Sequence, residues 1–451
     1  MGIGGYPEEV SRFLRSHGLD VGDRVRLHLA SGLVLEGVVM PRYSPSTRRV
    51  LVLKLRNGYN VGVRIGEISN VERLERVAQE SPGAPVPLVE EVSVAEDRRV
   101  ALIGTGGTIA SRVDYETGAV KPSLSQEELV LSVPEAFQYA RIDVEELYSI
   151  LSEDMKPGMW ARIAEEAARK LESGYDGVVI AHGTDTMGYT AAALSFAFHK
   201  GLPGPIALTG AQRSSDRPSS DAAFNLTAAV LVASKAPFAE VTVVMHGETG
   251  DSYALAHRGV RVRKMHTSRR DAFQSINALP LAKVYPQDGR IEIVDPSHRP
   301  RGGGLELENG FDERVALIKH FPGATGEIID LLLDRGFHGI VVEGTGFGHI
   351  ASDAIGAVRR ATEMGVPVVV ASQTLFGRVN LNVYSNGRRL LEAGAIPVED
   401  MLPETAYAKL SWVLARTRDL GEVRRLMTTN LAGEISWRHN LRLYPRWRHS
   451  A

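Results

Sequence analysis

The sequence predicts an α/β protein: a small N-terminal β-barrel of the SH3-like or Sm-like kind, followed by a two-domain, three-layer α/β core. Three observations support this fold class. Short alternating runs separated by turn residues fill about the first 75 residues. From Arg98 onward, apolar strand-length runs alternate with helix-length segments, which is typical of a parallel sheet covered by helices. The 451 residues also exceed one typical core, so roughly two to four domains are expected.

The N-terminal module, residues 1–77, begins with a predicted helix over residues 6–17 that Gly18 ends. Four alternating runs then predict strands over residues 23–29, 33–40, 49–55 and 59–65. Asn57-Gly58 predicts a hairpin because both residues tolerate positive φ. The module is locally basic, at Arg24, Arg26, Arg42, Arg48, Arg49, Lys54, Arg56 and Arg64. A solvated face is the simpler explanation of this charge, and docking of a partner or RNA is the alternative.

The remaining boundaries follow from composition. Residues 80–87 (ESPGAPVP) predict a stiff, exposed linker within residues 78–97. The first α/β domain is expected over residues 98–300 and the second over 311–440, divided by the charged, glycine-rich residues 296–310. An amphipathic helix is predicted over residues 161–171. Buried strands are predicted over residues 178–181, 205–209, 241–245, 339–342 and 366–371.

Composition excludes several classes of function. The absence of cysteine excludes disulfides, thiolate catalysis and cysteine metal sites. Lys plus Arg (52) nearly balances Asp plus Glu (54), so any contact with RNA is expected to be local or through a partner. No run of 18 apolar residues and no signal peptide is found, which predicts a cytoplasmic protein without membrane association. The histidines lack zinc-type spacing and no Gly-x-Ser-x-Gly elbow occurs, so neither a metal nor a Ser-His-Asp triad is expected.

Two loops carry the candidate chemistry. Residues 104–111 (GTGGTIAS) and 182–187 (HGTDTM) each follow an apolar strand-like run. Each therefore places threonines at the carboxyl end of a strand, where open α/β sheets bind ligands. A dinucleotide site requires Gly or Ala where Ile109 stands, and a phosphate-binding loop requires a Gly-Lys-Ser/Thr that no glycine run provides.

Together the two loops resemble those of the asparaginase and glutaminase family. The resemblance implies that Thr108 attacks the side-chain amide of the substrate and that Thr184 and Asp185 assist. It extends to residues 263–266 (RKMH), where Lys264 falls on the family's catalytic lysine. The substrate-binding residues implied by the resemblance are Tyr115 in a mobile loop, Ser152, which would hold the α-carboxylate, and Glu153, which stands where many members have glutamine.

These residue types suit amide hydrolysis. A threonine hydroxyl needs a base to accept its proton, and the amide nitrogen needs a proton as ammonia departs. Lys264 is expected to supply the base if burial keeps its amine neutral, with Asp185 orienting it and Thr184 relaying the proton. Backbone N–H groups at the two glycine turns are the expected oxyanion donors. His182 is expected to support its turn rather than to react.

The barrel ahead of the core and residues 382–391, 399–406 and 427–435 resemble one branch of this family, the D subunits of archaeal tRNA-dependent amidotransferases. The resemblance implies that this chain hydrolyses L-glutamine and that ammonia passes to an E subunit, which converts Glu-tRNA(Gln) to Gln-tRNA(Gln). ATP and magnesium would be used by the E subunit, so no cofactor is expected in this chain. A homodimer of this chain flanked by two E subunits, an α2β2 heterotetramer that binds tRNA mainly through its partner, is implied.

Two alternatives stay open at this point. The first is a free-standing cytoplasmic L-asparaginase with an accessory β-barrel. The second is a non-catalytic scaffold that binds RNA through the basic barrel, against which the presence of Thr108, Thr184, Asp185 and Lys264 argues.

Overall fold

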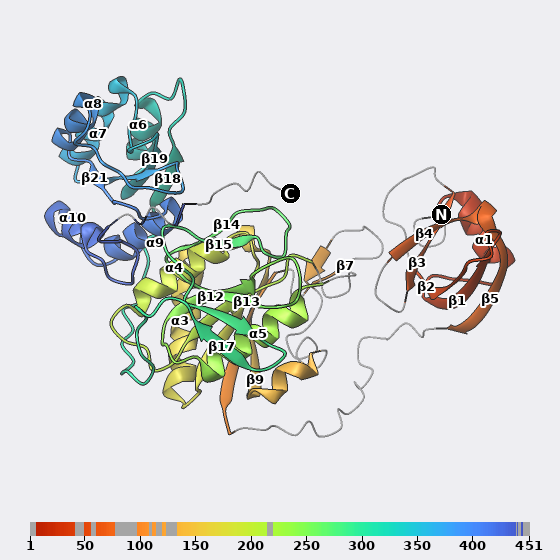
Figure 1. Cartoon of the computed structure of the whole chain (residues 1–451). Coiled ribbons are helices and arrows are strands. Elements are labelled where there is room, and N and C mark those ends of the chain that lie inside the picture. The colour runs from red at the N-terminus through yellow and green to blue at the C-terminus, as the bar shows by residue number, and fades with distance from the viewer. Residues whose placement is uncertain are drawn as a thin grey trace.

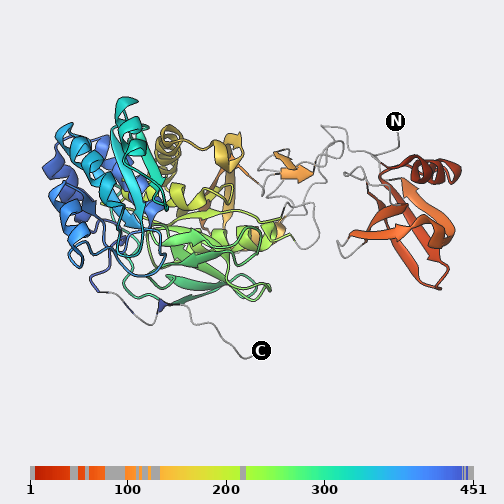
Figure 2. The same ribbon diagram turned by 90° about the horizontal axis from the view of Figure 1, so that it is seen from above.

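The computed structural model describes residues 6–40, 49–55, 60–76, 97–107, 111–113, 120–122, 133–213, 220–438, 440 and 443–444. Several sequence expectations fall outside these residues: Thr108, Tyr115, the basic residues Arg42, Arg48 and Arg56, the hairpin turn at 57–58 and the linker at 80–87. The N-terminal barrel lies apart from the α/β core (Figure 1), and the core divides into two lobes that lie against each other (Figure 2).

The N-terminal module is a helix packed on a five-stranded antiparallel sheet. Its spatial strand order is β4-β3-β2-β1-β5. Its elements are α1 (Glu8–Ser16), β1 (Asp23–Leu29), β2 (Val34–Val39), β3 (Val50–Leu55), β4 (Asn60–Arg64), the 3₁₀ turn η2 (Ile65–Glu67) and β5 (Ile68–Arg76). Val10 and Leu14 of the helix are buried against strand residues such as Leu27 and Leu51. The helix and four strands were predicted, whereas β5 was missed.

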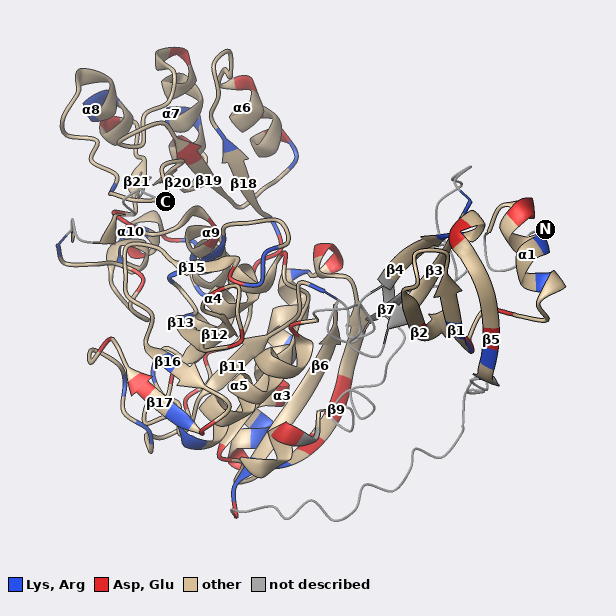
Figure 3. Ribbon diagram, turned by 45° about the vertical axis from the view of Figure 1, so that its right-hand side comes forward, with Lys and Arg blue, Asp and Glu red and all other residues tan. Residues whose placement is uncertain are grey.

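Several of the described basic residues of the barrel are paired with acids of the barrel itself. Arg24 and Arg26 both contact Glu36, and Arg26 also contacts Glu72 at 3.1 Å. Arg49 pairs with the helix residue Glu9. Figure 3 accordingly shows both signs of charge on the module. These pairs favour a solvated, self-compensating face over a basic docking surface for this part of the barrel.

The first lobe of the core is built on an eight-stranded sheet in the order β17-β16-β13-β12-β11-β10-β6-β9. Strands β6, β9, β10, β11 and β12 are parallel, and β13, β16 and β17 extend the sheet in antiparallel fashion. The strands are β6 (Arg99–Gly106), β9 (Arg141–Ile150), β10 (Gly177–Ala181), β11 (Ile206–Thr209), β12 (Val241–His246), β13 (Ala254–Arg258), β16 (Ala282–Tyr285) and β17 (Arg290–Ile293). Two small ribbons accompany them, β7 (Ser111–Val113) with β8 (Val120–Pro122) and β14 (Val262–Lys264) with β15 (Phe273–Ser275).

Helices cover both faces of this sheet, which confirms the three-layer prediction. One buried cluster joins the sheet to α3 (Pro157–Glu172) and α4 (Met187–Ala197). Another joins it to α5 (Ala222–Lys235) and the 3₁₀ helix η4 (Pro134–Gln138). The helix predicted to begin at residue 161 begins earlier, at Pro157. Proline fits the first helical position because the N–H that it lacks has no partner within the helix there.

The second lobe is a four-stranded parallel sheet with helices. Its strands are β18 (Val315–Lys319), β19 (Gly339–Gly344), β20 (Val368–Ser372) and β21 (Ile396–Pro397). Its helices are α6 (Glu327–Asp334), η6 (Ser352–Ala354), α7 (Ile355–Glu363), α8 (Ser385–Glu392), α9 (Pro403–Leu414) and α10 (Leu420–Thr428). Phe196 of α4 and Trp412 of α9 belong to one buried cluster, so the two lobes share a hydrophobic core. Within the described ranges, no helix is long and apolar enough to cross a membrane.

Candidate active site

The two glycine turns predicted from the sequence touch each other at the carboxyl edge of the large sheet. Strands β6 and β10 are parallel neighbours, so the loops that follow them lie side by side. Gly107 has φ of 82°, and a Cβ placed on it would lie 2.4 Å from the Cα of Gly183. A Cβ on Gly183 would lie 2.5 Å from the Cβ of Ser152. Only glycine permits these approaches, and Thr108 directly follows Gly107 in the chain.

Lys264 completes a cluster with the second loop. Its Nζ lies 2.8 Å from Thr184 Oγ1 and 2.7 Å from Asp185 Oδ1. The Lys264 side chain is 14% exposed, and the Asp185 side chain is 69% exposed. Thr184 is buried. The structure therefore brings together three of the four predicted catalytic residues, with the amine and hydroxyl inside and the carboxylate at the solvent edge.

This geometry allows the proton to move in either direction. As an ammonium, Lys264 can donate to Thr184 and Asp185 at once. As a neutral amine it has a lone pair, which can accept the hydroxyl proton of Thr184 across the same 2.8 Å. The pair can therefore act as a proton acceptor when a nucleophile approaches and as a donor when a leaving group departs.

Ser152 links the first lobe's edge strand to the same cluster. It is buried in the 3₁₀ turn η5 (Ser152–Asp154), directly after β9. Its Oγ lies 3.5 Å from Asp185 Oδ2, at the long limit of a hydrogen bond, so the hydroxyl can turn toward a ligand. Thr186 Oγ1 donates to the Ser152 carbonyl oxygen at 2.7 Å, which connects the η5 turn to the loop that follows β10. Glu153, by contrast, is exposed.

Thr186 was not identified from the sequence, although it lies inside the second motif. Gly210 is another missed residue: a Cβ there would lie 3.0 Å from Thr184 Cγ2. The signal for Thr186 was its place in residues 182–187, and the signal for Gly210 was its place in residues 209–213 (TGAQR), which also resemble the family.

His182 supports the second loop from beneath. It is fully buried, with Nε2 2.9 Å from Thr190 Oγ1 and Nδ1 2.7 Å from the Gly183 carbonyl oxygen. Burial lowers the pKa of His182 to about 4, and the hydrogen bond to Gly183 opposes that shift. His182 is therefore neutral near pH 7 and holds the turn in place, as expected.

The structure removes one N–H group, that of Gly107, from the expected oxyanion donors. The N–H of Gly107 donates to the Ile150 carbonyl oxygen at 3.0 Å and so serves the pairing of β6 with β9. A register shift between Gly104 and Gly106 produces this contact. The Gly107 N–H is therefore directed at the chain rather than at a substrate.

No group of three or more His, Asp or Glu residues that could hold a metal occurs among the residues described.

The fold and this cluster define an amidohydrolase of the asparaginase type. Residues 99–298 match the family model "Asparaginase, N-terminal", and residues 314–427 match "Glutaminase/Asparaginase C-terminal domain". Among solved structures, the thermostable L-asparaginase from Thermococcus kodakarensis is 35% identical, with a TM-score of 0.66, over 75% of this chain and 99% of that chain. L-asparaginase I from Vibrio cholerae is 31% identical, with a TM-score of 0.65, over the same shares.

The part of the chain outside those asparaginases identifies the branch. Residues 19–74 match the model "GatD N-terminal domain". The D subunit of glutamyl-tRNA(Gln) amidotransferase from Aeropyrum pernix is 65% identical over 92% of this chain and 97% of that protein. The D subunit from Thermococcus kodakarensis is 56% identical over 95% of this chain and 97% of that protein. The chain belongs to the family of glutamyl-tRNA(Gln) amidotransferase D subunits, and this membership is favoured over that of a free-standing asparaginase.

Proposed function

We propose that this chain is the glutaminase of a tRNA-dependent amidotransferase. It hydrolyses L-glutamine to glutamate and ammonia, and the ammonia passes to an E subunit that converts Glu-tRNA(Gln) to Gln-tRNA(Gln) with ATP and magnesium. The observation that carries the proposal is the contact of Lys264 Nζ with both Thr184 Oγ1 and Asp185 Oδ1 beside the turn that leads to Thr108.

The reaction would proceed in two stages. Thr108 Oγ attacks the side-chain amide carbon of glutamine, and its proton passes through Thr184 to the neutral amine of Lys264. The tetrahedral intermediate collapses when the C–N bond breaks, and the leaving nitrogen takes a proton and departs as ammonia. Water then attacks the ester on Thr108, its proton follows the same route, and glutamate is released. Asp185 would keep the lysine oriented throughout.

Substrate binding is assigned to the residues around this pair. Ser152 would hold the α-carboxylate, because its buried hydroxyl has only a 3.5 Å contact with Asp185 to give up. Tyr115 would close over the substrate, and the exposed Glu153 would lie at the rim near the α-amino group. The contacts of Ser152 with Asp185 and Thr186 of the second loop support this arrangement.

The assembly is part of the proposal. The name of the relatives implies a complex of unlike subunits, and we propose a homodimer of this chain flanked by two E subunits, with tRNA bound mainly by the E subunits. The ion-paired arginines of the barrel support a limited direct role of this module in tRNA binding. A cytoplasmic location fits a partner that uses tRNA and ATP.

The test is Thr108→Val in the complex with the E subunit. We expect glutamine-dependent amidation to fall by at least ~10³-fold, and amidation driven by added ammonium to stay at the wild-type rate. Thr105→Val is the matched control, because Thr105 lies three residues before Thr108, its hydroxyl donates to the Ala181 carbonyl oxygen of the neighbouring strand β10 at 2.9 Å, and it has no assigned role in the chemistry. Loss of both activities in Thr108→Val, or of neither, would contradict the proposal.

A comparison of substrates tests the asparaginase alternative. We expect glutamine hydrolysis to exceed asparagine hydrolysis when the E subunit and misacylated tRNA are present. A faster turnover of asparagine, unaffected by the E subunit, would instead support a free-standing asparaginase.

A further inference from the structure

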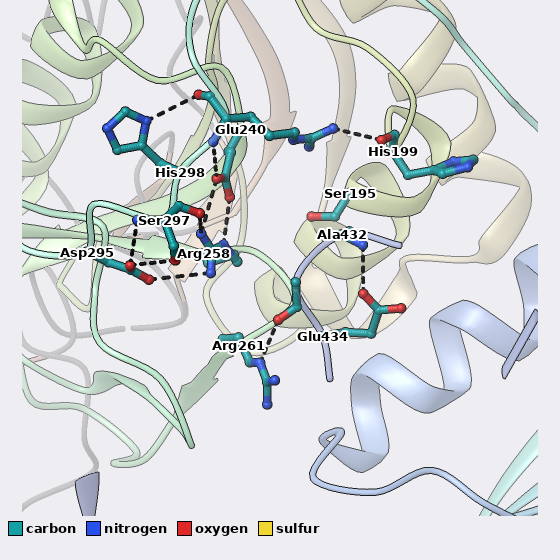
Figure 4. Close-up of polar contacts among 12 residues, drawn as sticks. Ser195, His199, Glu240, Arg258, Arg261, Asp295, Ser297, His298, Ala432 and Glu434 are labelled. Carbon is teal, nitrogen blue, oxygen red and sulfur yellow. Dashed lines mark hydrogen bonds and ion pairs between the residues drawn. The ribbon is translucent and has the colours of Figure 1, made fainter. Parts of the chain in front are cut away.

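The segment that follows α10, residues 430–436, is anchored to the protein by buried charges, and Glu434 is its buried residue. We call this segment the clasp. Lys409 of α9 and Glu434 of the clasp are both 0% exposed, and Lys409 Nζ lies 2.5 Å from Glu434 Oε1. Lys409 also donates to the Thr429 carbonyl oxygen at 2.6 Å. Glu434 Oε2 accepts from the backbone N–H of Ala432 at 2.7 Å (Figure 4). The buried ion pair is therefore supplemented by hydrogen bonds, as a charge removed from water requires.

A second buried cation reaches the clasp from the first lobe. Arg261 is 1% exposed. Its Nε donates to the Gly433 carbonyl oxygen and its Nη2 to Ser436 Oγ, both at 2.8 Å. Its Nη1 lies 3.0 Å from Asp400 Oδ2, and the other oxygen of Asp400 accepts from the Ser436 N–H at 2.9 Å. The guanidinium fork thus fixes the clasp and the second lobe at one point.

The clasp fits closely against a neighbouring arginine as well. Gly433 has φ of 90°, and a Cβ placed there would lie 2.9 Å from Arg258 Cδ. Arg258 is itself held by Glu240, with Nε 2.7 Å from Oε2 (Figure 4). Arg258 ends β13 and Arg261 directly precedes β14, so the clasp packs on both ends of the turn between these strands.

This turn leads directly to Lys264. Strand β14 has three residues, the first follows Arg261 and the last is Lys264. An extended chain rises about 3.3 Å per residue, so Arg261 anchors the strand within ~10 Å of the lysine Cα. Thr405 Oγ1 of α9 donates to the Val260 carbonyl oxygen at 3.0 Å and holds the same turn. The start of the strand is therefore fixed by the clasp and second lobe, and its end presents Nζ to Thr184 on the first lobe.

We infer that Arg261, held by the clasp, is a positioning residue for Lys264. The inference rests on the proposed catalytic role of Lys264. If the guanidinium loses its hold, β14 can shift along its partner β15 and move Nζ away from Thr184. Misplacement of a reacting group by about 1 Å typically costs ~10²-fold in rate. The motif at residues 427–435 thereby acquires a role in the reaction without touching the substrate.

The first test is Arg261→Lys, which keeps the charge beside Asp400 but cannot reproduce the fork. In the complex, kcat for glutamine hydrolysis should fall about 10- to 100-fold, KM should stay within about twofold, and ammonium-driven amidation should be unchanged. Arg301→Lys is the matched control. Its guanidinium donates to the Ser234 and Ala236 carbonyl oxygens and lies by Asp176, at the end of β10 away from the site. That variant should lose stability but keep kcat.

A second pair of variants moves the clasp without changing charge. Gly433→Ala should lower kcat in the same way, because its Cβ would collide with Arg258. Gly365→Ala is the control, since Gly365 also has positive φ, 75°, but has no atom within 4 Å of the added Cβ. It should keep kcat.

The decisive measurement is a double-variant cycle. If Arg261 acts through Lys264, Arg261→Lys should lower kcat in the wild-type background and have no further effect in Lys264→Ala. Wild-type kcat in both Arg261→Lys and Gly433→Ala, or full additivity with Lys264→Ala, would overturn the inference. Wild-type kcat in Lys264→Ala alone would instead overturn the proposed function, so the two failures are distinguishable.

Discussion

Two lysine–carboxylate pairs in this molecule have nearly the same length but opposite surroundings. Lys264 lies 2.7 Å from Asp185, whose side chain is 69% exposed. Lys409 lies 2.5 Å from Glu434, and neither side chain is exposed. In the first pair the amine also contacts a hydroxyl, Thr184 Oγ1, at an edge open to a ligand. In the second pair the amine hydrogen-bonds only to oxygen atoms of the protein itself, which cannot be exchanged for a ligand. Whether one partner remains free to change contacts, rather than how close the charges are, separates a reactive pair from a structural one.

The largest expected effect comes from breaking the reactive pair. Lys264→Arg keeps the charge, but a guanidinium cannot be deprotonated at working pH and cannot act as a base. We expect glutamine hydrolysis to fall by about 10³-fold, measured as ammonia release. Stability should change by less than about 0.5 kcal/mol, because a pair with an exposed partner contributes little. Near-wild-type turnover over a range of pH values would remove Lys264 from the catalytic residues.

Breaking the structural pair should have the opposite effect: a large loss of stability rather than a large loss of turnover. Lys409→Met leaves the charge of Glu434 buried without its partner, which costs about 3–5 kcal/mol of unfolding free energy. Chemical denaturation measures this loss. Adding Glu434→Gln should recover part of it, because the stranded charge is then gone. A loss below about 1 kcal/mol in Lys409→Met would show that the two pairs do not differ as described.

His182 adds a third case to the comparison of the two pairs. It is buried and no carboxylate pairs with it, so it is neutral. Its pKa is about 4 in the fold, below the ordinary value of 6.5, so the unfolded chain binds a proton first as the pH falls. Its contribution to stability is complete above pH 6.5 and is lost as the pH falls from there toward 4. Between pH 7 and pH 5 the loss should be about 2 kcal/mol.

The measurement for His182 is the unfolding free energy at several pH values for the wild type and His182→Asn. The variant should lack this component of the pH dependence. Equal slopes in the two proteins would show that His182 is not held neutral.

The smallest effect is expected at Ser152, whose contact with Asp185 is the longest in the site at 3.5 Å. Ser152→Ala should raise KM for glutamine up to about tenfold, the value of one hydrogen bond, and leave kcat within about twofold. Ser173→Ala, at the exposed end of α3, is a suitable control. A fall in kcat without a change in KM would show that Ser152 orients Asp185 rather than the substrate.

The sequence predicted the elements that follow a regular period and missed those that break it. The strands β1 to β4 alternate and were recognised. Strand β5 was missed because its pairing with β1 contains two register shifts. Leu27 pairs with Val71 and Leu29 with Ile68, so two residues on one strand span three on the other. A bulge of this kind destroys the period of two on which the prediction depends.

The site shows the same division. The positions of Thr184, Asp185 and Lys264 could be predicted because a motif fixes the residue types. The use of the Gly107 N–H could not, because it depends on an irregular register between β6 and β9. The clasp was recognised only as a segment that resembles the family. A signal for it existed in Lys409, the one charged residue after the first turn of the mostly apolar helix α9, but its partner lies 25 residues away.

The contact between Gly107 and Gly183 has a genetic consequence. Every base change that replaces either glycine with another amino acid adds a Cβ. At Gly107 that atom would lie 2.4 Å from the backbone of Gly183, and at Gly183 it would lie 2.5 Å from the Cβ of Ser152, whose position the backbone fixes. Backbone cannot move aside as a flexible side chain can. A saturation library at these two codons should therefore yield active clones only with synonymous changes. The identity of these two positions is then set by the space between two neighbouring strands, whatever substrate the loops around them come to accept.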